Sequence, residues 1–499
     1  MSNEASENSR KIKEPSYADA IIPLVVLIGL IAASVFLFGI DAVGGPMEVA
    51  LILAGTVAYL IVLKNGYTWE DIERTGKIAF GTIVTPIFIL FAVGALIGTW
   101  NMSGTIPTLV FYGMKLLQPS YFYLATAIIC ALTSLSIGSS WTTAGTIGVG
   151  LVGLATLVGV SPAITAGAVI SGSYLGDKLS PLSETTVLTA QLAEIDIYTH
   201  LRAQLWTSVP AFLIAALVFG ILGLRATIAP GIDTGSELSK LDQLFWITPW
   251  NLIPMVVLII LSVRKVPAQL AITASALVAG IMAPFLQHEA VMRFVNDPAV
   301  SAPVAYIKGI WLAMATGYKA NSGIPVLDRL LSRGGMASML KTLWIIIGAV
   351  TFGTILEEFK LLSKLIDPLM KRAKTTGSLI GAVLATAVGL NIFAGDQYIA
   401  LVLPSRLFRV EFKTRRLKPQ NLSRTCADGG TVTSPLVPWN SCGAFMAATL
   451  GVSTILYLPF CVFNYASPIM SLIWGITGMK IERFEAVQPE RQPSGRRAA

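Results

Sequence analysis

The chain has 499 residues, of which 54% are hydrophobic and only 13% charged, and its mean hydropathy is +0.70. In soluble domains about a quarter of all residues are charged, so this composition excludes an ordinary soluble protein and indicates a polytopic membrane protein. The net charge of +8 fits the cytoplasmic excess of Lys and Arg that orients membrane proteins, and no basic patch interleaved with aromatic residues indicates a nucleic-acid partner.

Eight apolar runs approach the length of about 20 residues that a membrane-crossing helix needs. They cover residues 20–40, 47–63, 78–98, 204–224, 245–263, 267–286, 339–357 and 455–475. The first run is not a secretory signal, because its apolar core is too long and no small-residue cleavage pattern follows Ile40. Together with the broken segments described next, the pattern predicts an all-α polytopic membrane protein with about ten transmembrane helices and two re-entrant hairpins.

The first predicted hairpin covers residues 119–160, whose polar centre lies at 136–143. No Lys or Arg occurs between Leu116 and Gly176, so this hairpin is expected to open outward. The second hairpin covers residues 376–410 and has basic clusters on both flanks. It is therefore expected to enter and leave on the cytoplasmic side, with its tip at 391–396 in mid-membrane.

Each half also contains a polar segment broken by proline, at residues 176–186 and 428–441. An ionisable residue at membrane depth normally faces a partner or a water-filled path. Pro and Gly indicate a helix break whose free backbone groups line a cavity. Two such segments, one in each half, are typical of a transporter's central site.

The two halves align at a slowly drifting offset, as a diverged internal repeat does. Gly138-Ser139 matches Gly395-Asp396, and Ser180-Pro181-Leu182 matches Ser434-Pro435-Leu436. The charge pattern makes corresponding helices run in opposite directions, so the repeats are predicted to be inverted. The predicted organisation is a cytoplasmic tail (1–19), peripheral helices (20–63), a first repeat (78–224, with hairpin 119–160 and broken helix 162–199), connecting helices and external segments (225–338), a second repeat (339–475, with hairpin 376–410 and broken helix 420–450) and a cytoplasmic tail (476–499).

Oxygen-bearing side chains at these breaks are the candidates for binding and moving ions. Na⁺ is a hard cation that prefers oxygen ligands, as Ca²⁺ and Mg²⁺ do, and a proton can compete with it for a carboxylate. The candidates are Asp177, Ser180, Ser183, Glu184, Thr185, Thr186, Asn391, Asp396, Asp428, Ser434, Asn440 and Ser441, with Lys178 as a candidate counter-charge.

Each acid also has a structural interpretation. Asp177 and Lys178 point about 100° apart on a helix, so Asp177 is either a cation ligand or proton carrier, or part of an ion pair that holds the break together. Glu184 stands near the start of a half-helix, where the helix dipole favours an acid whatever its function. Asp428 is either a ligand or the cap of its half-helix, and Asp396 either functions in transport or makes a buried structural bond.

Other residues near the breaks have equally plain alternatives. Ser and Thr in membrane helices often bond back to the carbonyl four residues earlier. Glu357 and Glu358 are expected at a solvated helix end. Trp141 and Trp439 flank the expected site, where they either seal it or simply pack.

Long motifs carry a resemblance to a known family. Residues 173–186 (SYLGDKLSPLSETT), 331–336 (LSRGGM), 395–398 (GDQY) and 433–443 (TSPLVPWNSCG) resemble the signature of the NhaC family of sodium/proton antiporters. The resemblance covers nearly the whole chain. One departure is that the family pattern commonly reads Ser-Asp-Thr-Thr-Asn where residues 183–187 read Ser-Glu-Thr-Thr-Val.

The resemblance implies a cation-coupled antiporter of the ion-transporter superfamily, a homodimer in the bacterial cytoplasmic membrane. It implies exchange of Na⁺ for H⁺, and relatives that exchange malate against lactate with the same ions. We predict alternating access at a midplane carboxylate site, with Na⁺, H⁺ and the lipid bilayer as partners and no cofactor or other metal. The alternative is a cation-coupled organic-anion or amino-acid antiporter. An enzyme is disfavoured because the chain has neither HExxH nor GxSxG, and a channel would not need paired acids at two inverted breaks.

Overall fold

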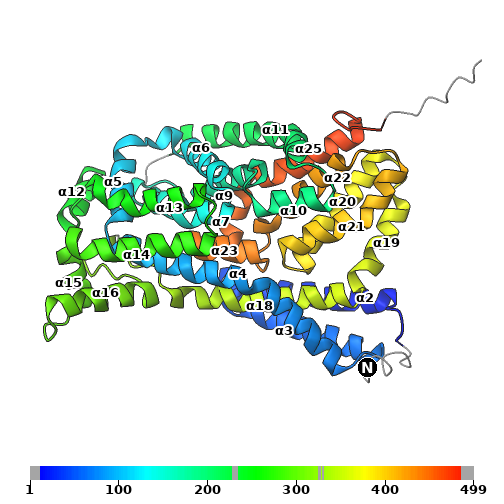
Figure 1. The fold of residues 1–499 in the computed structure, drawn as a ribbon, viewed down its shortest axis with the longest axis horizontal. Helices are drawn as coiled ribbons and strands as arrows, with labels where there is room; N and C mark the ends of the chain where they lie inside the picture. The colour runs from blue at the N-terminus through cyan, green and yellow to red at the C-terminus, as the bar shows by residue number, and fades with distance from the viewer. Residues whose placement is uncertain (1–11, 227–233, 324–326, 329–330, 485–499) are drawn as a thin grey trace, which may run out of the picture.

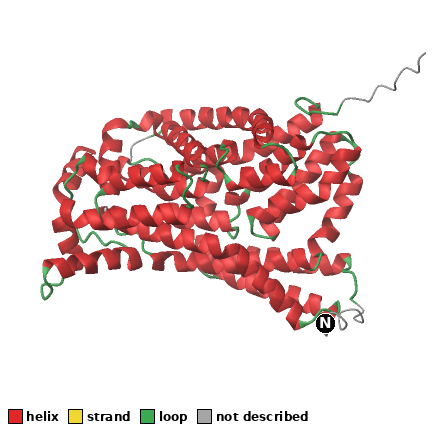
Figure 2. Cartoon of the chain, viewed as in Figure 1, coloured by secondary structure: helices red, strands yellow, loops and turns green. Residues whose placement is uncertain are grey.

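The computed structural model describes residues 12–226, 234–323, 327–328 and 331–484. Within these ranges every named element is a helix (Figure 2). The N-terminal elements are α2 (Tyr17–Phe38), η1 (Gly39–Gly44), α3 (Pro46–Lys64), α4 (Trp69–Met102), α5 (Thr105–Leu116), α6 (Pro119–Ile137), α7 (Ser140–Thr143), η2 (Ala144–Gly148), α8 (Val149–Val158), α9 (Pro162–Leu179), α10 (Glu184–Leu192) and α11 (Ile197–Leu224).

The later elements connect the halves and build the second one. They are α12 (Thr234–Leu244), η3 (Pro249–Leu252), α13 (Ile253–Val263), α14 (Ala268–Leu286), α15 (His288–Val295), α16 (Ala302–Thr316), η4 (Met336–Met339), α18 (Leu340–Glu358), α19 (Leu361–Arg372), α20 (Thr376–Phe393), α21 (Gln397–Thr414), α22 (Pro419–Cys426), η5 (Ala427–Thr431), η6 (Ser434–Leu436), α23 (Ser441–Leu450), α24 (Thr454–Tyr457), η7 (Leu458–Phe460) and α25 (Val462–Thr477).

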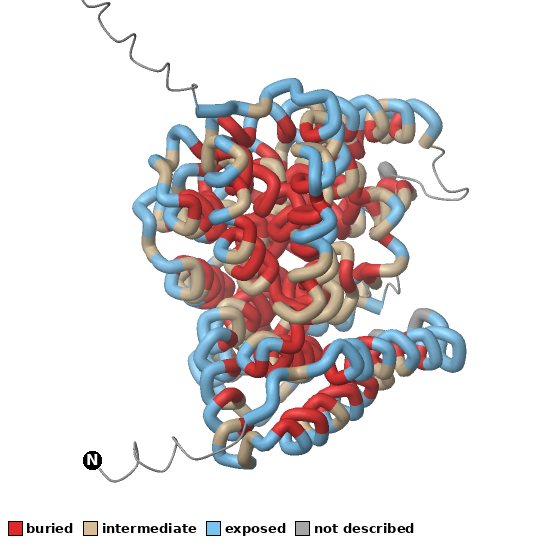
Figure 3. Tube along the Cα trace, turned by 90° about the vertical axis from the view of Figure 1, so that its right-hand side faces the viewer, coloured by how far each residue is buried: buried red, intermediate tan, exposed pale blue. Residues whose placement is uncertain are grey.

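The prediction of a polytopic membrane protein is confirmed. Nine helices within the described ranges are long and apolar enough to cross a membrane, or ten if the bent pair Ser441–Leu450 and Thr454–Phe460 is one span. Large apolar side chains such as Phe36, Leu213 and Phe285 point outward, with 89%, 63% and 81% of their surface exposed. Most of the buried residues lie in the interior of the molecule (Figure 3). Apolar residues outside and polar residues inside are what a lipid environment selects.

Three predicted segments differ from the structure. The span expected at 245–263 is only Pro249–Val263, because extended backbone at Thr248 delays the helix. The span expected at 455–475 is divided, since α24 and η7 end at Phe460 as part of a pair with α23 that is bent by 91°, and the long helix α25 starts at Val462. The external stretch 225–244, expected to be linker-like, contains α12, while its residues 227–233 lie outside the described ranges.

In both segments predicted as hairpins, two helical arms follow each other across a short turn, and a hydrogen bond links their outer ends. That these segments re-enter the membrane stays a prediction. The Ser161 N–H donates to the Tyr123 hydroxyl at 2.9 Å, which joins the end of α8 to the start of α6. In the second hairpin, where α20 lies beside α21 (Figure 1), Arg415 Nη1 donates to the Thr375 carbonyl at 3.2 Å. The arms turn at Gly138 and Gly395, whose φ values of +79° and +64° suit glycine. The inverted relation of the two halves stays a prediction.

Close helix contact positions the first break beside the first hairpin tip. On α9, a Cβ at Gly172 or Gly176 would collide with the backbone of α6, including Ala131. These glycines therefore let the two helices approach closely, as small residues do in membrane proteins. The contact brings the C-terminal end of α9 next to residues 138–140.

Candidate functional site

Asp177 lies at the junction between the first broken helix and the first hairpin tip. Its carboxylate accepts hydrogen bonds from the Ser140 hydroxyl (2.6 Å), the Ser140 N–H (3.2 Å) and the Ser183 hydroxyl (2.5 Å). The side chain is buried, and among the described residues no base pairs with it. The ion-pair alternative for Asp177 therefore does not describe this structure. The Asp177 carboxylate is therefore flanked by two hydroxyl groups, those of Ser140 and Ser183. Each hydroxyl could also turn its oxygen toward a cation.

Lys178 points away from Asp177 and pairs with Asp428 in the other half. The Lys178 ammonium also donates to the hydroxyls of Thr207 (3.1 Å) and Ser467 (2.9 Å), and Ser467 donates to Asp428 at 2.5 Å. Both charged side chains are almost fully buried, with 1% and 0% exposed. Lys178, the predicted counter-charge, is thus paired with Asp428. This buried cluster of Lys178, Asp428 and their hydroxyl partners connects α9 to η5.

Asp396 lies at the tip of the second hairpin, where it caps α21. One carboxylate oxygen accepts the backbone N–H groups of Tyr398 (2.8 Å) and Ile399 (3.2 Å). The other accepts from the Ser441 hydroxyl at 3.4 Å, and the Ser441 N–H donates to the Gly395 carbonyl at 2.9 Å. These contacts join the second hairpin tip to the start of α23, so each half has one acid at the same kind of junction.

Both acids face one cavity of about 780 Å³, here called the acidic cavity. Its lining comes from α4, the two hairpin tips, the first helix break, the α13–α14 turn, the end of α18 and the start of α23. The acids on its described lining are Asp177, Glu184, Glu357, Glu358 and Asp396, and Lys265 is the basic residue on that lining. Five carboxylates against one ammonium make this cavity attractive to cations.

Contacts between the halves enclose this cavity. The Tyr398 hydroxyl donates to Glu184 at 3.0 Å, which connects α21 to α10. Trp141 stacks on Phe445 with ring centroids 4.1 Å apart and an interplanar angle of 11°, which connects α7 to α23. Neither contact could be read from sequence, because each joins residues more than 200 positions apart.

The structure divides the predicted site residues into two groups. On the acidic cavity or bonded to the carboxylates of its acids lie Asp177, Ser183, Glu184, Thr185, Asp396 and Ser441. Away from its lining, in contacts within the protein, lie Lys178, Ser180, Thr186, Asn391, Asp428, Ser434 and Asn440.

Asn391 shows what the second group does. Its amide donates to the carbonyls of Gly429 (3.3 Å) and Gly430 (2.6 Å) and to the Thr433 hydroxyl (3.0 Å), and its oxygen accepts from Asn440 at 3.1 Å. These bonds hold α20 against the second break. In this arrangement Asn391 and Asn440 satisfy backbone groups that the break would otherwise leave unpaired in a buried region.

Sequence reasoning did not assign a site role to Glu357 and Glu358 or to Ser140. The glutamates were expected at a solvated helix end, and they do stand at the end of α18, but they also line the cavity. Ser140 belongs to the polar centre of the first hairpin, a signal that could have singled it out as the partner of an acid across the junction.

One buried acid at the first helix break and another at the second hairpin tip, inside a bundle with an apolar exterior, are typical of a membrane transporter rather than a soluble binding module. Comparison with known proteins gives the family. The model of the Na⁺/H⁺ antiporter family matches residues 4–202 and 172–479, and the chain belongs to that family.

Three relatives align over nearly their full length. The chain is 33% identical over 480 residues to the Na⁺/H⁺ antiporter NhaC of Alkalihalophilus pseudofirmus, covering 96% of this chain and 99% of the relative. It is 34% identical over 472 residues to a malate-2H⁺/Na⁺-lactate antiporter of Bacillus subtilis, covering 94% and 96%. It is 32% identical over 490 residues to the arginine/ornithine antiporter ArcD of Halobacterium salinarum, covering 96% and 95%. The NhaC-type resemblance of the motifs is confirmed.

Proposed function

We propose that this protein exchanges Na⁺ for H⁺ across the cytoplasmic membrane, and that Na⁺ and protons compete for Asp177 and Asp396. The observation that carries the proposal is the position of these two buried carboxylates on one cation-attracting cavity. The names of the NhaC relatives support the same exchange. The expected homodimer belongs to this proposal.

The chain's own groups suit both cargoes. Na⁺ would be held by the carboxylate of Asp177 and by the hydroxyl oxygens of Ser140 and Ser183, which now donate to that carboxylate. A proton on the carboxylate would replace the charge of the ion without needing those oxygens. A loaded or protonated site is neutral or nearly so, whereas an empty charged site is costly to move through a bilayer.

The acidic cavity is proposed to face the cytoplasm, because Arg264 and Lys265 stand at its α13–α14 turn and basic residues mark cytoplasmic loops. We propose that the Trp141–Phe445 stack closes the path on the other side of the acids. Alternating access would require this stack to part while the contacts around the acidic cavity close.

An organic-anion or amino-acid antiporter coupled to cations is the second candidate. The names of the Bacillus malate-lactate relative and the Halobacterium arginine/ornithine relative favour it. In both candidates the acidic cavity handles the cation.

Uptake of ²²Na⁺ into proteoliposomes, driven by an imposed pH gradient, tests the proposal. Uptake that needs the gradient and is unaffected by unlabelled malate, lactate or arginine supports plain Na⁺/H⁺ exchange. Uptake that requires one of these solutes on the opposite side supports the second candidate. Absence of gradient-driven Na⁺ movement under all these conditions contradicts both.

Cysteine labelling tests the orientation on which the mechanism depends. In a cysteine-free background, single cysteines at Thr375 and Thr414 should react with an impermeant reagent from the cytoplasm only. Cysteines at Gln118 and Ser161 should react from outside only. Labelling of Thr375 and Thr414 from opposite sides would contradict the second hairpin and the inverted repeat together.

A further inference from the structure

A second cavity, of about 590 Å³, lies at the other end of α4 and α18. On α4 its lining includes Ile97, whereas the acidic cavity reaches from Ile78 to Ile89. Its lining also includes Met339, the last residue of η4 directly before α18, whereas the acidic cavity meets α18 only from Thr354 onward. Fifteen residues of helix between the last two positions correspond to about 22 Å. We call it the arginine cavity, after Arg333.

Arg333 is carried into this cavity by an extended chain that only glycines could accommodate. The Gly335 N–H donates to the Gly94 carbonyl of α4 at 2.6 Å, and a Cβ on Gly94 would lie 2.6 Å from the Gly335 oxygen. Gly317 and Gly334 also have positive φ, at +88° and +91°. The close contact with α4 fixes the position of residues 331–336, a motif that is not part of the acidic cavity.

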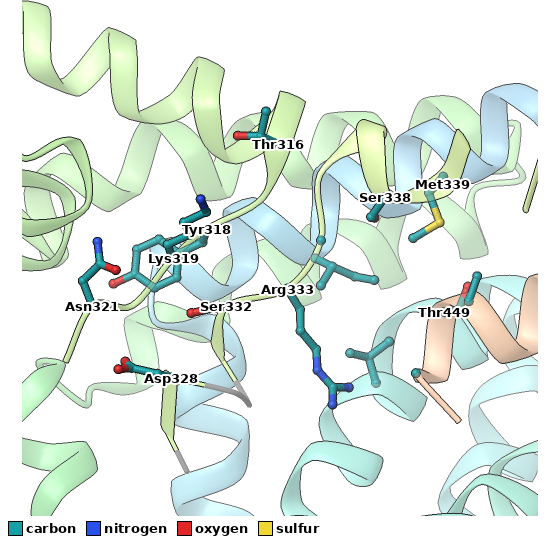
Figure 4. Close-up of a pocket in the computed structure, with 15 residues that line it drawn as sticks. Thr316, Tyr318, Lys319, Asn321, Asp328, Ser332, Arg333, Ser338, Met339 and Thr449 are labelled. Atoms are coloured by element: carbon teal, nitrogen blue, oxygen red, sulfur yellow. The ribbon is translucent and has the colours of Figure 1, made fainter. Parts of the chain in front are cut away.

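The guanidinium of Arg333 is half-buried and has no acidic partner among the described residues. In the described part of the chain, no hydrogen bond or ion pair is made by this side chain. It lies against Gly451, where an added Cβ would come within 2.7 Å of Nη1. Figure 4 shows the side chain directed away from Asp328, the acid on the described lining, which instead accepts two bonds from Ser322. Burial lowers the pKa of Arg333 with no acid to offset it.

One further polar group on this lining is unsatisfied. The hydroxyl of Thr449 is buried, with 3% of the residue exposed, and it has no hydrogen-bond partner within the described residues. Unpaired buried donors are rare in native proteins and point to a missing partner. The wall beside this hydroxyl is apolar and is formed by Ile97, Val149, Met339 and Ala448.

We propose that the arginine cavity binds a small organic acid, with its carboxylate on Arg333, the Thr449 hydroxyl as a further donor and its carbon chain on the apolar wall. The planar guanidinium matches a carboxylate with two parallel hydrogen bonds, a geometry that a spherical anion cannot use. The apolar wall disfavours phosphate, which is polar on every side. This site is separate from the acidic cavity and does not depend on the Na⁺/H⁺ proposal.

The alternative is a purely structural arginine, because α23 ends at Leu450 and a cation is favoured at a helix C-terminus. A binding measurement distinguishes the two. Radiolabelled L-lactate should bind saturably to the purified full-length protein in lipid nanodiscs. Butyrate should compete with it, whereas chloride and phosphate at equal ionic strength should not.

Substitutions then locate the site. Arg333→Gln should weaken lactate binding by about tenfold or more, and Arg333→Lys, which keeps the charge but loses the fork, should be intermediate. Thr449→Val should weaken it by about fivefold. Lys341→Gln is the matched control, because Lys341 is an exposed base at the same end of α18 that is not on the lining of this cavity, and it should change binding by less than about twofold.

Two outcomes would overturn the proposal: no saturable lactate binding by the wild-type protein, or wild-type affinity in Arg333→Gln. Competition by chloride and phosphate as strong as that of butyrate would overturn the carboxylate assignment. Thermal unfolding of each variant in nanodiscs, compared with Arg333→Lys, separates lost binding from lost folding. Asp177→Asn should retain lactate binding, so failure of the Na⁺/H⁺ proposal would leave this one standing.

Discussion

The two halves of the molecule each pair a buried acid with a serine, but the positions of the acid and the serine are interchanged between the halves. In the first half the acid, Asp177, is on the broken helix and its serine partner, Ser140, is at the hairpin tip. In the second half the acid, Asp396, is at the hairpin tip and the serine, Ser441, starts the helix after the break. Each half thus contributes one buried aspartate and its serine partner to the same cavity.

The acids differ in what holds them. Hydroxyls at 2.6 and 2.5 Å surround Asp177, and a hydroxyl can turn its oxygen toward a cation. Asp396 is held mainly by two backbone N–H groups of its own helix, which stay in place whether or not an ion is bound. We infer that Asp177 rearranges its contacts with each ion, whereas the Asp396 carboxyl group keeps its position while its proton or Na⁺ is exchanged.

The largest expected effect is loss of either carboxylate. Asp177→Asn and Asp396→Asn should each reduce pH-driven ²²Na⁺ uptake to the level of protein-free liposomes, because a neutral amide cannot exchange a proton for Na⁺. Asparagine caps helices as well as aspartate does, so the Asp396 variant should still fold.

Asp196→Asn is the control matched to Asp396. Asp196 caps α11 with the same pattern, accepting the N–H groups of Tyr198 (2.9 Å) and Thr199 (3.1 Å), but it is not on the acidic cavity. It should exchange like the wild type. Normal exchange by both Asp177→Asn and Asp396→Asn would place the ion site elsewhere.

The next effect separates Asp177 from its neighbour. Removing one partner of the buried Lys178–Asp428 pair, by Lys178→Met or Asp428→Asn, should destabilise the protein by about 3–5 kcal/mol, because a buried charge is left unpaired. The double variant Lys178→Met with Asp428→Leu should recover much of that loss. Equilibrium unfolding in detergent measures all three, and a double variant no more stable than the single ones would show that the pair is not a structural link.

Local signals in the sequence predicted most of the fold. Glycine at a turn and proline in an apolar run act on their own backbone, so the hairpin tips at Gly138 and Gly395 and both helix breaks could be read directly. The helical periodicity also showed that Asp177 and Lys178 need not pair. The partners they do have lie in other elements, and Lys178 finds Asp428 only after 250 residues of intervening chain have folded.

The candidate site could be predicted only in part, for the same reason. Asp177 and Asp396 could be recognised as candidate site residues because a charged residue in a membrane-spanning stretch is costly and is usually functional. Asn391 and Asp428 carried the same signal, yet the structure places them in contacts away from the cavity. Glu357 carried no signal, because an acid at a helix end is ordinary until a cavity is known to open there.

A smaller effect tests the different attachment of the two acids. Ser140→Ala should raise the apparent KM for Na⁺ about tenfold or more, because it removes a short hydrogen bond to a carboxylate and a ligand oxygen. Ser441→Ala, its counterpart in the other half, should raise the KM by less than about threefold, since that contact is 3.4 Å long. Initial rates of ²²Na⁺ uptake at varied Na⁺ concentration measure both, and equal effects would contradict the proposed division of roles.

The smallest expected effect concerns the mouth of the acidic cavity, where charges act at a distance rather than by contact. Glu357 is half-buried and Glu358 is exposed, and Lys265 on the same lining is exposed too. Exposed charges concentrate counter-ions, and salt screens them within about 10 Å at 0.1 M. The double variant Glu357→Gln with Glu358→Gln should therefore raise the KM for Na⁺ about two- to threefold at low ionic strength. Lys265→Gln should lower it by a similar or smaller factor.

Both shifts in KM should vanish when choline chloride raises the ionic strength, whereas the effect of Ser140→Ala should persist, because a contact inside the site is not screened. A glutamate effect that survives high salt would instead make these residues direct ligands, and the cavity would then hold Na⁺ at its mouth as well as at its two acids.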